Sequence, residues 1–157
     1  MDLKKLLFSL VLCLGAGGIG YYFTMPSIGT WYALLQKPVF TPPNWIFGPV
    51  WTFLYIMMGI ALYCLWKKRD PKYKSKVPAY SWFYIQLILN VMWSAVFFGL
   101  HSIFGGLLII VGLWLAIALT ILKFREQVPS AAWLLVPYLL WVSYACLLNY
   151  SLWRLNG

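Results

Sequence analysis

The chain has 157 residues, of which 63% are hydrophobic, 20% are aromatic and only 10% are charged. A soluble domain usually carries about 25% charged residues, and a water-soluble fold of this length could not bury so much apolar surface. The composition therefore excludes a soluble globular protein and favours an integral membrane protein. The net charge of +9 arises from bases at the edges of apolar runs. No basic face exists outside those runs, so we expect no nucleic-acid partner.

The first half of the chain predicts two membrane-spanning helices joined by a long loop. A span needs about 20 mostly apolar residues. The first is expected over about residues 6–24, ending before Pro26, and the loop covers 25–41. The second is expected over 42–66, because Thr41 followed by two prolines is typical of a helix start with threonine as its cap.

The second half predicts three more spans, which makes one five-helix membrane domain. The uncharged stretch over 77–122 is too long for one span and suits two, over about 79–100 and 103–122. The last span is expected over about 130–153. Pro137 should bend it, because proline has no N–H to donate along the helix.

The bases predict the orientation of this all-α bundle. Five spans place the N-terminus and the loops over 67–78 and 123–129 on one side of the membrane. That side carries Lys4, Lys5, Lys67, Lys68, Arg69, Lys72, Lys74, Lys76, Lys123 and Arg125, and the other side carries only Lys37 and Arg154. The positive-inside rule then predicts the N-terminus inside and the C-terminus outside. A bacterial plasma membrane is favoured, and the mitochondrial outer membrane is the alternative.

The membrane interior contains no Asp, Glu, Lys or Arg, since Asp2, Asp70 and Glu126 all lie in loops on the basic side. Ion-coupled transport and paired-carboxylate catalysis need such groups, so any transport would be downhill. The single histidine, His101, lies at a short turn between spans and is expected to be interfacial. We expect no metal site and no resident cofactor.

Aromatic residues recur at helical spacing on three spans, with one amide, Asn90, near mid-membrane. The three faces are Phe47, Trp51, Tyr55 and Met58; Gln86, Asn90, Trp93 and Phe97; and Tyr138, Trp141, Ala145 and Leu148 or Asn149. An amide at that depth should face protein or a cavity. The faces describe either a pocket for a flat apolar ligand or plain packing between helices, and spacing alone leaves both open.

The loop between the first two spans is rich in aromatic residues and proline. We expect it to fold back onto the helix ends as a lid, with Trp31 and Tyr32 as apolar plugs and Lys37 available to an anionic ligand group. Two small-residue pairs, Ala16/Gly20 and Ala95/Gly99, allow close helix approach. They fit packing within the chain and a homodimer through the 79–100 helix equally well.

At this loop the chain resembles the translocator protein and tryptophan-rich sensory protein family (TspO), once called peripheral-type benzodiazepine receptors. The resemblance continues along the whole chain, and it is carried by Trp31-Tyr32, Gln36-Lys37-Pro38, Pro42-Pro43, Asn90…Trp93, Pro137-Tyr138…Trp141 and Asn149-Tyr150…Trp153-Arg154. It implies a five-helix bundle, often dimeric, that binds porphyrins, sterols such as cholesterol and benzodiazepine-type drugs under the first loop. Where animal members carry an aromatic residue near the start of the fourth helix, this chain has Gly105-Gly106.

The resemblance also implies which residues contact a ligand. By position the pocket would comprise Tyr32, Pro42, Trp51, Asn90, Trp93, Trp141, Ala145 and Leu148, and a sterol motif would comprise Leu148, Tyr150 and Arg154. The first function hypothesis is a sensor or downhill translocator for porphyrins and similar flat lipophiles, with membrane lipid as the further partner of a bundle that spans the bilayer. The alternative is an enzyme that degrades protoporphyrin with light and oxygen, using Trp51 and Trp141 as oxidisable side chains.

Overall fold

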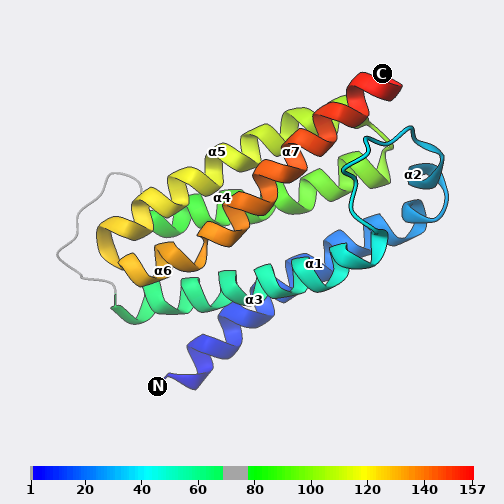
Figure 1. The fold of residues 1–157 in the computed structure, drawn as a ribbon. Helices are drawn as coiled ribbons and strands as arrows, with labels where there is room; N and C mark the ends of the chain where they lie inside the picture. The colour runs from blue at the N-terminus through cyan, green and yellow to red at the C-terminus, as the bar shows by residue number, and fades with distance from the viewer. Residues whose placement is uncertain (1, 69–77) are drawn as a thin grey trace.

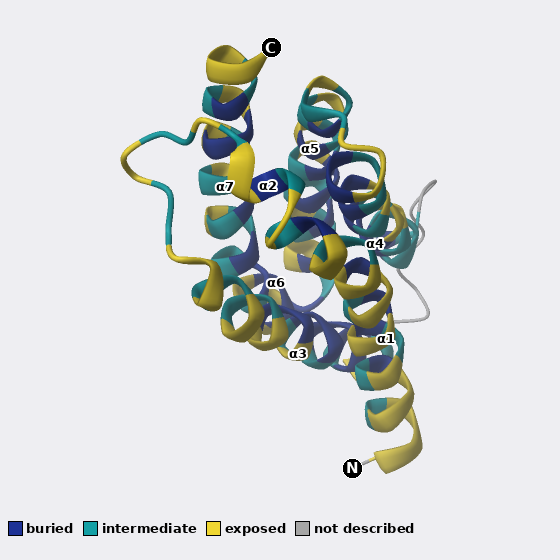
Figure 2. Cartoon of the chain, turned by 90° about the vertical axis from the view of Figure 1, so that its right-hand side faces the viewer, coloured by how far each residue is buried: buried dark blue, intermediate teal, exposed yellow. Residues whose placement is uncertain are grey.

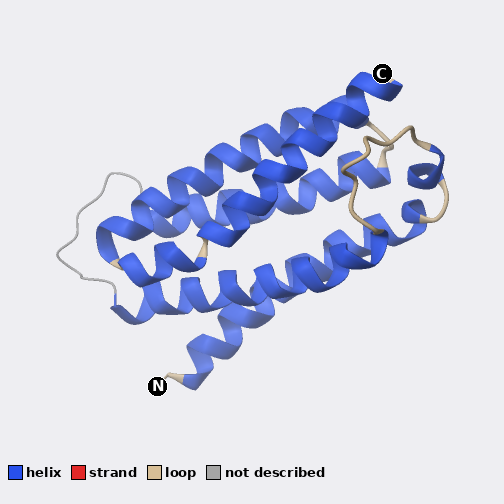
Figure 3. Cartoon of the chain, viewed as in Figure 1, coloured by secondary structure: helices blue, strands red, loops and turns tan. Residues whose placement is uncertain are grey.

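The computed structural model describes residues 2–68 and 78–157, and these residues form helices without any strand (Figures 1 and 3). In chain order the elements are α1 (Leu3–Ile28), α2 (Trp31–Leu34), α3 (Asn44–Lys68), α4 (Ala79–Ser94), a π-helical turn (Ala95–Gly99), α5 (Ile103–Gln127), α6 (Pro129–Leu134) and α7 (Val136–Asn156). Among the described residues, 5 helices are long and apolar enough to cross a membrane, with α4 continuing through the π-turn and α6 running on into α7.

The spans form a closed ring at one end of the bundle. Toward the other end α3 and α7 diverge, and we call the space between them the seam. Helix α1 packs between α3 and α4, and α5 packs between α4 and α7. The short α6 packs against α3 and closes the ring, but α7 diverges from α3 toward the end that carries α2 (Figure 1). Viewed from that end, the dark blue buried faces turn inward and the loop with α2 lies across the bundle (Figure 2).

The described bases are concentrated at one end of the bundle, as the sequence predicts. Lys4 and Lys5 begin α1, Lys67 and Lys68 end α3, and Lys123 and Arg125 lie in the last two turns of α5, all at one end (Figure 1). Lys37 and Arg154 lie at the other end. The remaining basic-side residues, Arg69, Asp70, Lys72, Lys74 and Lys76, lie outside the described residues.

The end of α1, at a proline, and the start of α3, near a threonine, differ from the sequence predictions. Helix α1 continues through Pro26 to Ile28. A proline in the last turns removes one intrahelical hydrogen bond and its φ already suits a helix. Helix α3 begins at Asn44, and Thr41 is not its cap. The Thr41 hydroxyl donates to the Pro38 carbonyl at 2.8 Å, which closes a turn before the helix.

The last two spans also differ in their bounds. Helix α5 runs to Gln127, past the expected end at Leu122, and an ion pair between Lys123 and Glu126 at 3.0 Å supports its last turns. The final span breaks at Leu135, two residues before Pro137, and therefore consists of α6 and α7. The break lets α6 lie against α3 while α7 turns away from it.

Glycines allow the closest approaches between helices. A Cβ on Gly20 of α1 would lie 3.2 Å from Ser94 Oγ of α4, and one on Gly99 would lie 3.1 Å from a ring carbon of Phe23. The glycine of each predicted small-residue pair therefore lies at a close contact within the chain. The homodimer through the 79–100 helix stays a prediction.

Gly59→Ala is expected to destabilise the protein, because α1 and α3 touch at this position. The added Cβ would lie 2.8 Å from Leu10 Cδ2, 3.1 Å from Leu10 Cα and 3.2 Å from the Ser9 carbonyl oxygen. Backbone atoms cannot yield locally, so we expect a loss of about 1–3 kcal/mol in the free energy of unfolding. The measurement is denaturant unfolding in detergent micelles, followed by circular dichroism.

Gly112→Ala in α5 is the matched control. An added Cβ there meets no heavy atom of the described residues within 4 Å. Alanine is the better helix former by up to about 1 kcal/mol, so this variant should be as stable as the parent or more so. Equal destabilisation by both substitutions would contradict the close contact at Gly59.

Candidate functional site

A buried amide joins three helices at the centre of the bundle. Asn90 of α4 is 1% exposed. Its Oδ1 accepts from the Tyr55 hydroxyl of α3 at 2.5 Å, and its Nδ2 donates to the Tyr138 hydroxyl of α7 at 2.7 Å. The amide therefore faces protein, as expected at that depth. Both of its ends are engaged, so the residue acts as a bridge between helices.

A second amide orients one of the candidate tryptophans. Trp93 Nε1 donates to Asn149 Oδ1 at 3.1 Å, and Asn149 Nδ2 donates to the Ile103 carbonyl at 3.0 Å. The Trp93 ring also stacks on Phe97, with centroids 5.5 Å apart and an interplanar angle of 20°. These contacts hold the indole in one position.

The aromatic faces of three helices meet beside this network. The Trp51 ring centroid lies 5.7 Å from that of Tyr55, 6.5 Å from that of Trp93 and 6.1 Å from that of Tyr138. We call Trp51, Tyr55, Trp93 and Tyr138 the inner aromatic cluster. These separations are normal for packed aromatic rings. The cluster brings together two of the predicted pocket tryptophans, on α3 and α4.

The π-helical turn supplies the next layer of aromatic rings toward the loop. Phe97 and Phe98 are consecutive, yet both are buried, at 2% and 8% exposed. Both rings lie in the interior because the π-turn packs against α1, α4 and α5. The Tyr32 ring packs on both, with centroids 6.4 and 5.7 Å away.

The first loop folds back over this layer, as expected. Trp31 stacks on His101, with centroids 4.6 Å apart and the rings 14° from parallel, and Tyr32 is 2% exposed. The exposed His101 sits at φ 55°, and its Nε2 lies 3.0 Å from Ser27 Oγ. The Ser27 hydroxyl uses its proton to donate to the Phe98 carbonyl at 2.7 Å. Its oxygen therefore accepts the hydrogen bond from His101, which requires a proton on Nε2 of the imidazole.

The far side of the loop is fastened to α7. The Asn156 side chain accepts from the Gln36 backbone N–H and donates to the Gln36 carbonyl, both at 2.8 Å. The Tyr144 hydroxyl donates to the Phe40 carbonyl. We call these contacts the loop clasp. The loop is thus held to the π-turn on one side and to α7 on the other.

Lys37 is used within the loop itself. Its Nζ lies 3.3 Å from the carbonyl oxygens of Ala33 and Leu35 and 4.7 Å from the Tyr32 ring centroid. It therefore caps the carbonyl end of α2 and covers the Tyr32 ring, a cation–π arrangement. The ammonium group would have to leave these partners to meet an anionic ligand.

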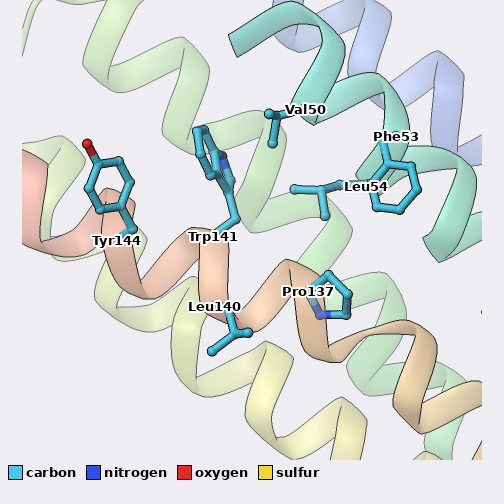
Figure 4. A pocket seen from close by; sticks show the side chains of 7 residues that line it. All are labelled: Val50, Phe53, Leu54, Pro137, Leu140, Trp141 and Tyr144. Atoms are coloured by element: carbon cyan, nitrogen blue, oxygen red, sulfur yellow. The ribbon is translucent and has the colours of Figure 1, made fainter. Parts of the chain in front are cut away.

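An open pocket of about 370 Å³ lies where α3 and α7 diverge (Figure 4). It is lined by Val50, Phe53, Leu54, Pro137, Leu140, Trp141 and Tyr144. Trp141 is the one residue that the sequence also predicted for a ligand site. The others follow helical spacing on α3 and α7, but apolar side chains at that spacing look the same in sequence whether they line a pocket or face lipid.

The remaining predicted residues surround this region without lining the pocket. Pro42 is half-buried in the loop, Ala145 is half-buried on α7 and Leu148 is buried on α7. Of the sterol motif, Tyr150 and Arg154 are exposed, and the Tyr150 ring lies 6.0 Å from Trp153. A Cβ on Gly106 would lie 2.7 Å from a ring carbon of Phe97, so Phe97 fills the space beside this helix start.

Two buried donors at the site have no hydrogen-bond partner among the residues that the structure describes: the Tyr32 hydroxyl and Trp141 Nε1. Leaving such a group unpaired costs about 1–3 kcal/mol. Burial, with a smaller effect from Tyr144, raises the pKa of Tyr32 to about 12. The hydroxyl therefore stays protonated at neutral pH and can donate to an acceptor.

The same chain matches known proteins over nearly its full length. The model of the TspO/MBR family matches residues 9–154. The tryptophan-rich protein TspO of Archaeoglobus fulgidus is 42% identical over 100% of both chains. The bovine translocator protein is 37% identical over 95% of this chain and 88% of its own. The tryptophan-rich sensory protein of Cereibacter sphaeroides is 35% identical over 80% of this chain and 77% of its own. The chain is a membrane protein and belongs to the TspO/MBR family.

Proposed function

We propose that the protein binds flat lipophilic molecules, porphyrins first among them, beneath the first loop and acts as their sensor or downhill translocator. Sterols and benzodiazepine-type drugs belong to the same ligand class. The observation that carries the proposal is the pair of buried, unpartnered donors, Tyr32 OH and Trp141 Nε1, set among aromatic rings. Relatives bear the names translocator protein and tryptophan-rich sensory protein, which fit either role.

The chemistry of the site suits a planar ligand with acceptors at its edge. Rings of Trp51, Trp93 and Trp141 offer faces and edges for stacking, and Pro42, Ala145 and Leu148 add apolar surface around them. The two free donors would orient a carbonyl, carboxylate or ring nitrogen. With Asn90 held by two tyrosines, we assign it to positioning the cluster.

We further propose a bacterial plasma membrane, with the N-terminus inside and the first loop outside. The support is the concentration of bases at the end of the bundle opposite the loop. The mitochondrial outer membrane is the alternative, because the relatives include bacterial and animal proteins.

Trp141→Phe is expected to weaken protoporphyrin binding about two- to tenfold, because it removes one donor and keeps an aromatic ring. The measurement is a titration of detergent-solubilised protein in the dark, following tryptophan quenching after inner-filter correction. Tyr32→Phe should behave alike. Trp133→Phe is the control, since Trp133 is 73% exposed on α6. Unchanged affinity in both site variants, or an equal loss in the control, would contradict the proposal.

The same samples test the second candidate, degradation of protoporphyrin by light and oxygen. It is favoured by the position of Trp141, an oxidisable indole that borders the open pocket (Figure 4). The bound porphyrin absorbs the light and is the net electron donor, dioxygen is the electron acceptor, and an indole that relays an electron between them returns to its starting state. On illumination, the Trp51→Phe/Trp141→Phe variant should lose the conversion. Conversion at the parent rate would exclude these residues.

A further inference from the structure

We infer that the ligand reaches this site sideways from the bilayer, through the pocket between α3 and α7, and that the first loop is a fixed cap. The inference rests on the proposed function. It assigns the pocket a role of its own, as an access route for molecules already dissolved in the membrane.

The route through the loop is closed by contacts on both sides. Reaching the inner aromatic cluster from water would require lifting at least one side of the loop. On one side Trp31 stacks on His101 and the Tyr32 ring packs on the two phenylalanines of the π-turn, and on the other the loop clasp joins the loop to α7. Either side is held by more than one contact. Each hydrogen bond is worth about 0.5–1.5 kcal/mol, and burial of aromatic surface adds to them.

The route through the seam is open and apolar. Phe53 and Leu140 flank the pocket and are 53% and 66% exposed. Both lie well inside membrane spans, so the medium that reaches them is the hydrocarbon of the bilayer. No backbone hydrogen bond has to break for an apolar molecule to move from lipid into this space.

The inner wall of the pocket separates it from the proposed binding region. Trp141 and Leu54 form this wall, with their side chains turned toward the space between the helices (Figure 4). Leu54 is fixed and buried, whereas Trp141 is half-buried and its N–H is unpartnered among the described residues. A swing of the Trp141 indole is therefore the smallest movement that joins the pocket to the inner aromatic cluster.

The helix break forms the mouth of the pocket. Helix α7 begins after Leu135, and α6 keeps its own packing against α3, so α7 leaves α3 at this point. Helix α7 is also held to α4 by the hydrogen bonds that join Tyr138 to Asn90 and Asn149 to Trp93. A tilt of the whole helix would strain these bonds, whereas a swing of Trp141 breaks none, since its N–H is unpartnered among the described residues.

The lining also narrows the class of ligand. The Tyr144 hydroxyl is already bonded to the Phe40 carbonyl, so the pocket offers a charged group no free partner except Trp141 Nε1 among the described residues. A ligand that takes this route must carry its polar groups along one edge. That edge can stay near the membrane surface, at the level of the loop, while the apolar face slides between the helices.

The test compares two cross-linked variants in lipid vesicles, built on a full chain with Cys13, Cys64 and Cys146 replaced by alanine. Phe53→Cys/Leu140→Cys allows the seam to be tied with a short bis-maleimide, and Gln36→Cys/Asn156→Cys allows the loop to be tied. Protoporphyrin is delivered from donor vesicles in the dark, and the rate and extent of tryptophan quenching are recorded. Each cross-linked variant is compared with its own form before cross-linking, so that any effect of the cysteine substitutions themselves cancels.

We expect the seam cross-link to slow binding about tenfold or more and the loop cross-link to change the rate less than about twofold. Slowing by the loop cross-link alone, or equal slowing by both, would overturn lateral access and leave the binding proposal intact. Absence of saturable quenching in the cysteine-free parent and the wild-type chain would instead overturn the proposed function.

Discussion

Asn90→Leu is expected to lower the free energy of unfolding by about 2–5 kcal/mol. Two hydrogen bonds inside a membrane protein are together worth only about 1 kcal/mol on average. The larger cost comes from the Tyr55 and Tyr138 hydroxyls, which are both buried and would lose Asn90 as their partner. Each orphaned group costs about 1–3 kcal/mol. The measurement is reversible unfolding in mixed detergent.

A triple variant separates orphaned hydroxyls from lost packing. Tyr55→Phe/Asn90→Leu/Tyr138→Phe removes all three polar groups together, and replacing both partners of a hydrogen bond is nearly neutral. We therefore expect it to recover most of the stability that Asn90→Leu loses. If the triple variant is as unstable as the single one, the amide contributes through shape and not through its hydrogen bonds.

Asn156→Ala is expected to speed amide hydrogen exchange in the first loop about five- to a hundredfold. The substitution removes both bonds to the Gln36 backbone, each worth about 0.5–1.5 kcal/mol, and every 1.4 kcal/mol changes an opening equilibrium tenfold. The effect should be read at the Thr41 amide, which is bonded to the Pro38 carbonyl within the loop. Mass spectrometry of peptides over residues 31–43 supplies the measurement.

Gln36→Ala is the matched control for the clasp. Asn156 bonds to the backbone N–H and carbonyl of Gln36, and alanine keeps both. Exchange in this variant should match the parent. Should Gln36→Ala open the loop as far as Asn156→Ala does, the reciprocal pair is not what holds the loop down.

The architecture follows from the sequence because length and charge decide it in a membrane. Runs of apolar residues must be long enough to span, and Lys and Arg are costly inside, so five spans and their shared basic end can be read directly. The burial of Asn90 and the packing of Trp31 and Tyr32 on the helix ends can be predicted in the same way. An amide is costly in lipid, and aromatic side chains of a loop are stabilised by packing on apolar surface.

The pocket and the hydrogen-bond partners could not be predicted in the same way. Val50 and Leu140 are apolar whether they face lipid or a cavity, and only the divergence of α7 from α3 decides which. Thr41 looks like a helix cap, but α3 begins only at Asn44, and the Thr41 hydroxyl closes a turn with the Pro38 carbonyl before it. Phe97 and Phe98 lie in a π-turn, for which adjacent residue types carry no signal.

The neutral interior of the bundle has an electrical consequence. Charged residues are confined to the first turn of α1, the last two turns of the other spans, and the loops. Moving one elementary charge through the membrane field costs about 2.3 kcal/mol per 100 mV, and a swing of the Trp141 indole moves none. The membrane potential should therefore leave the conformational equilibria of the empty protein unchanged. Any voltage dependence found during transport would report the charge of the ligand itself.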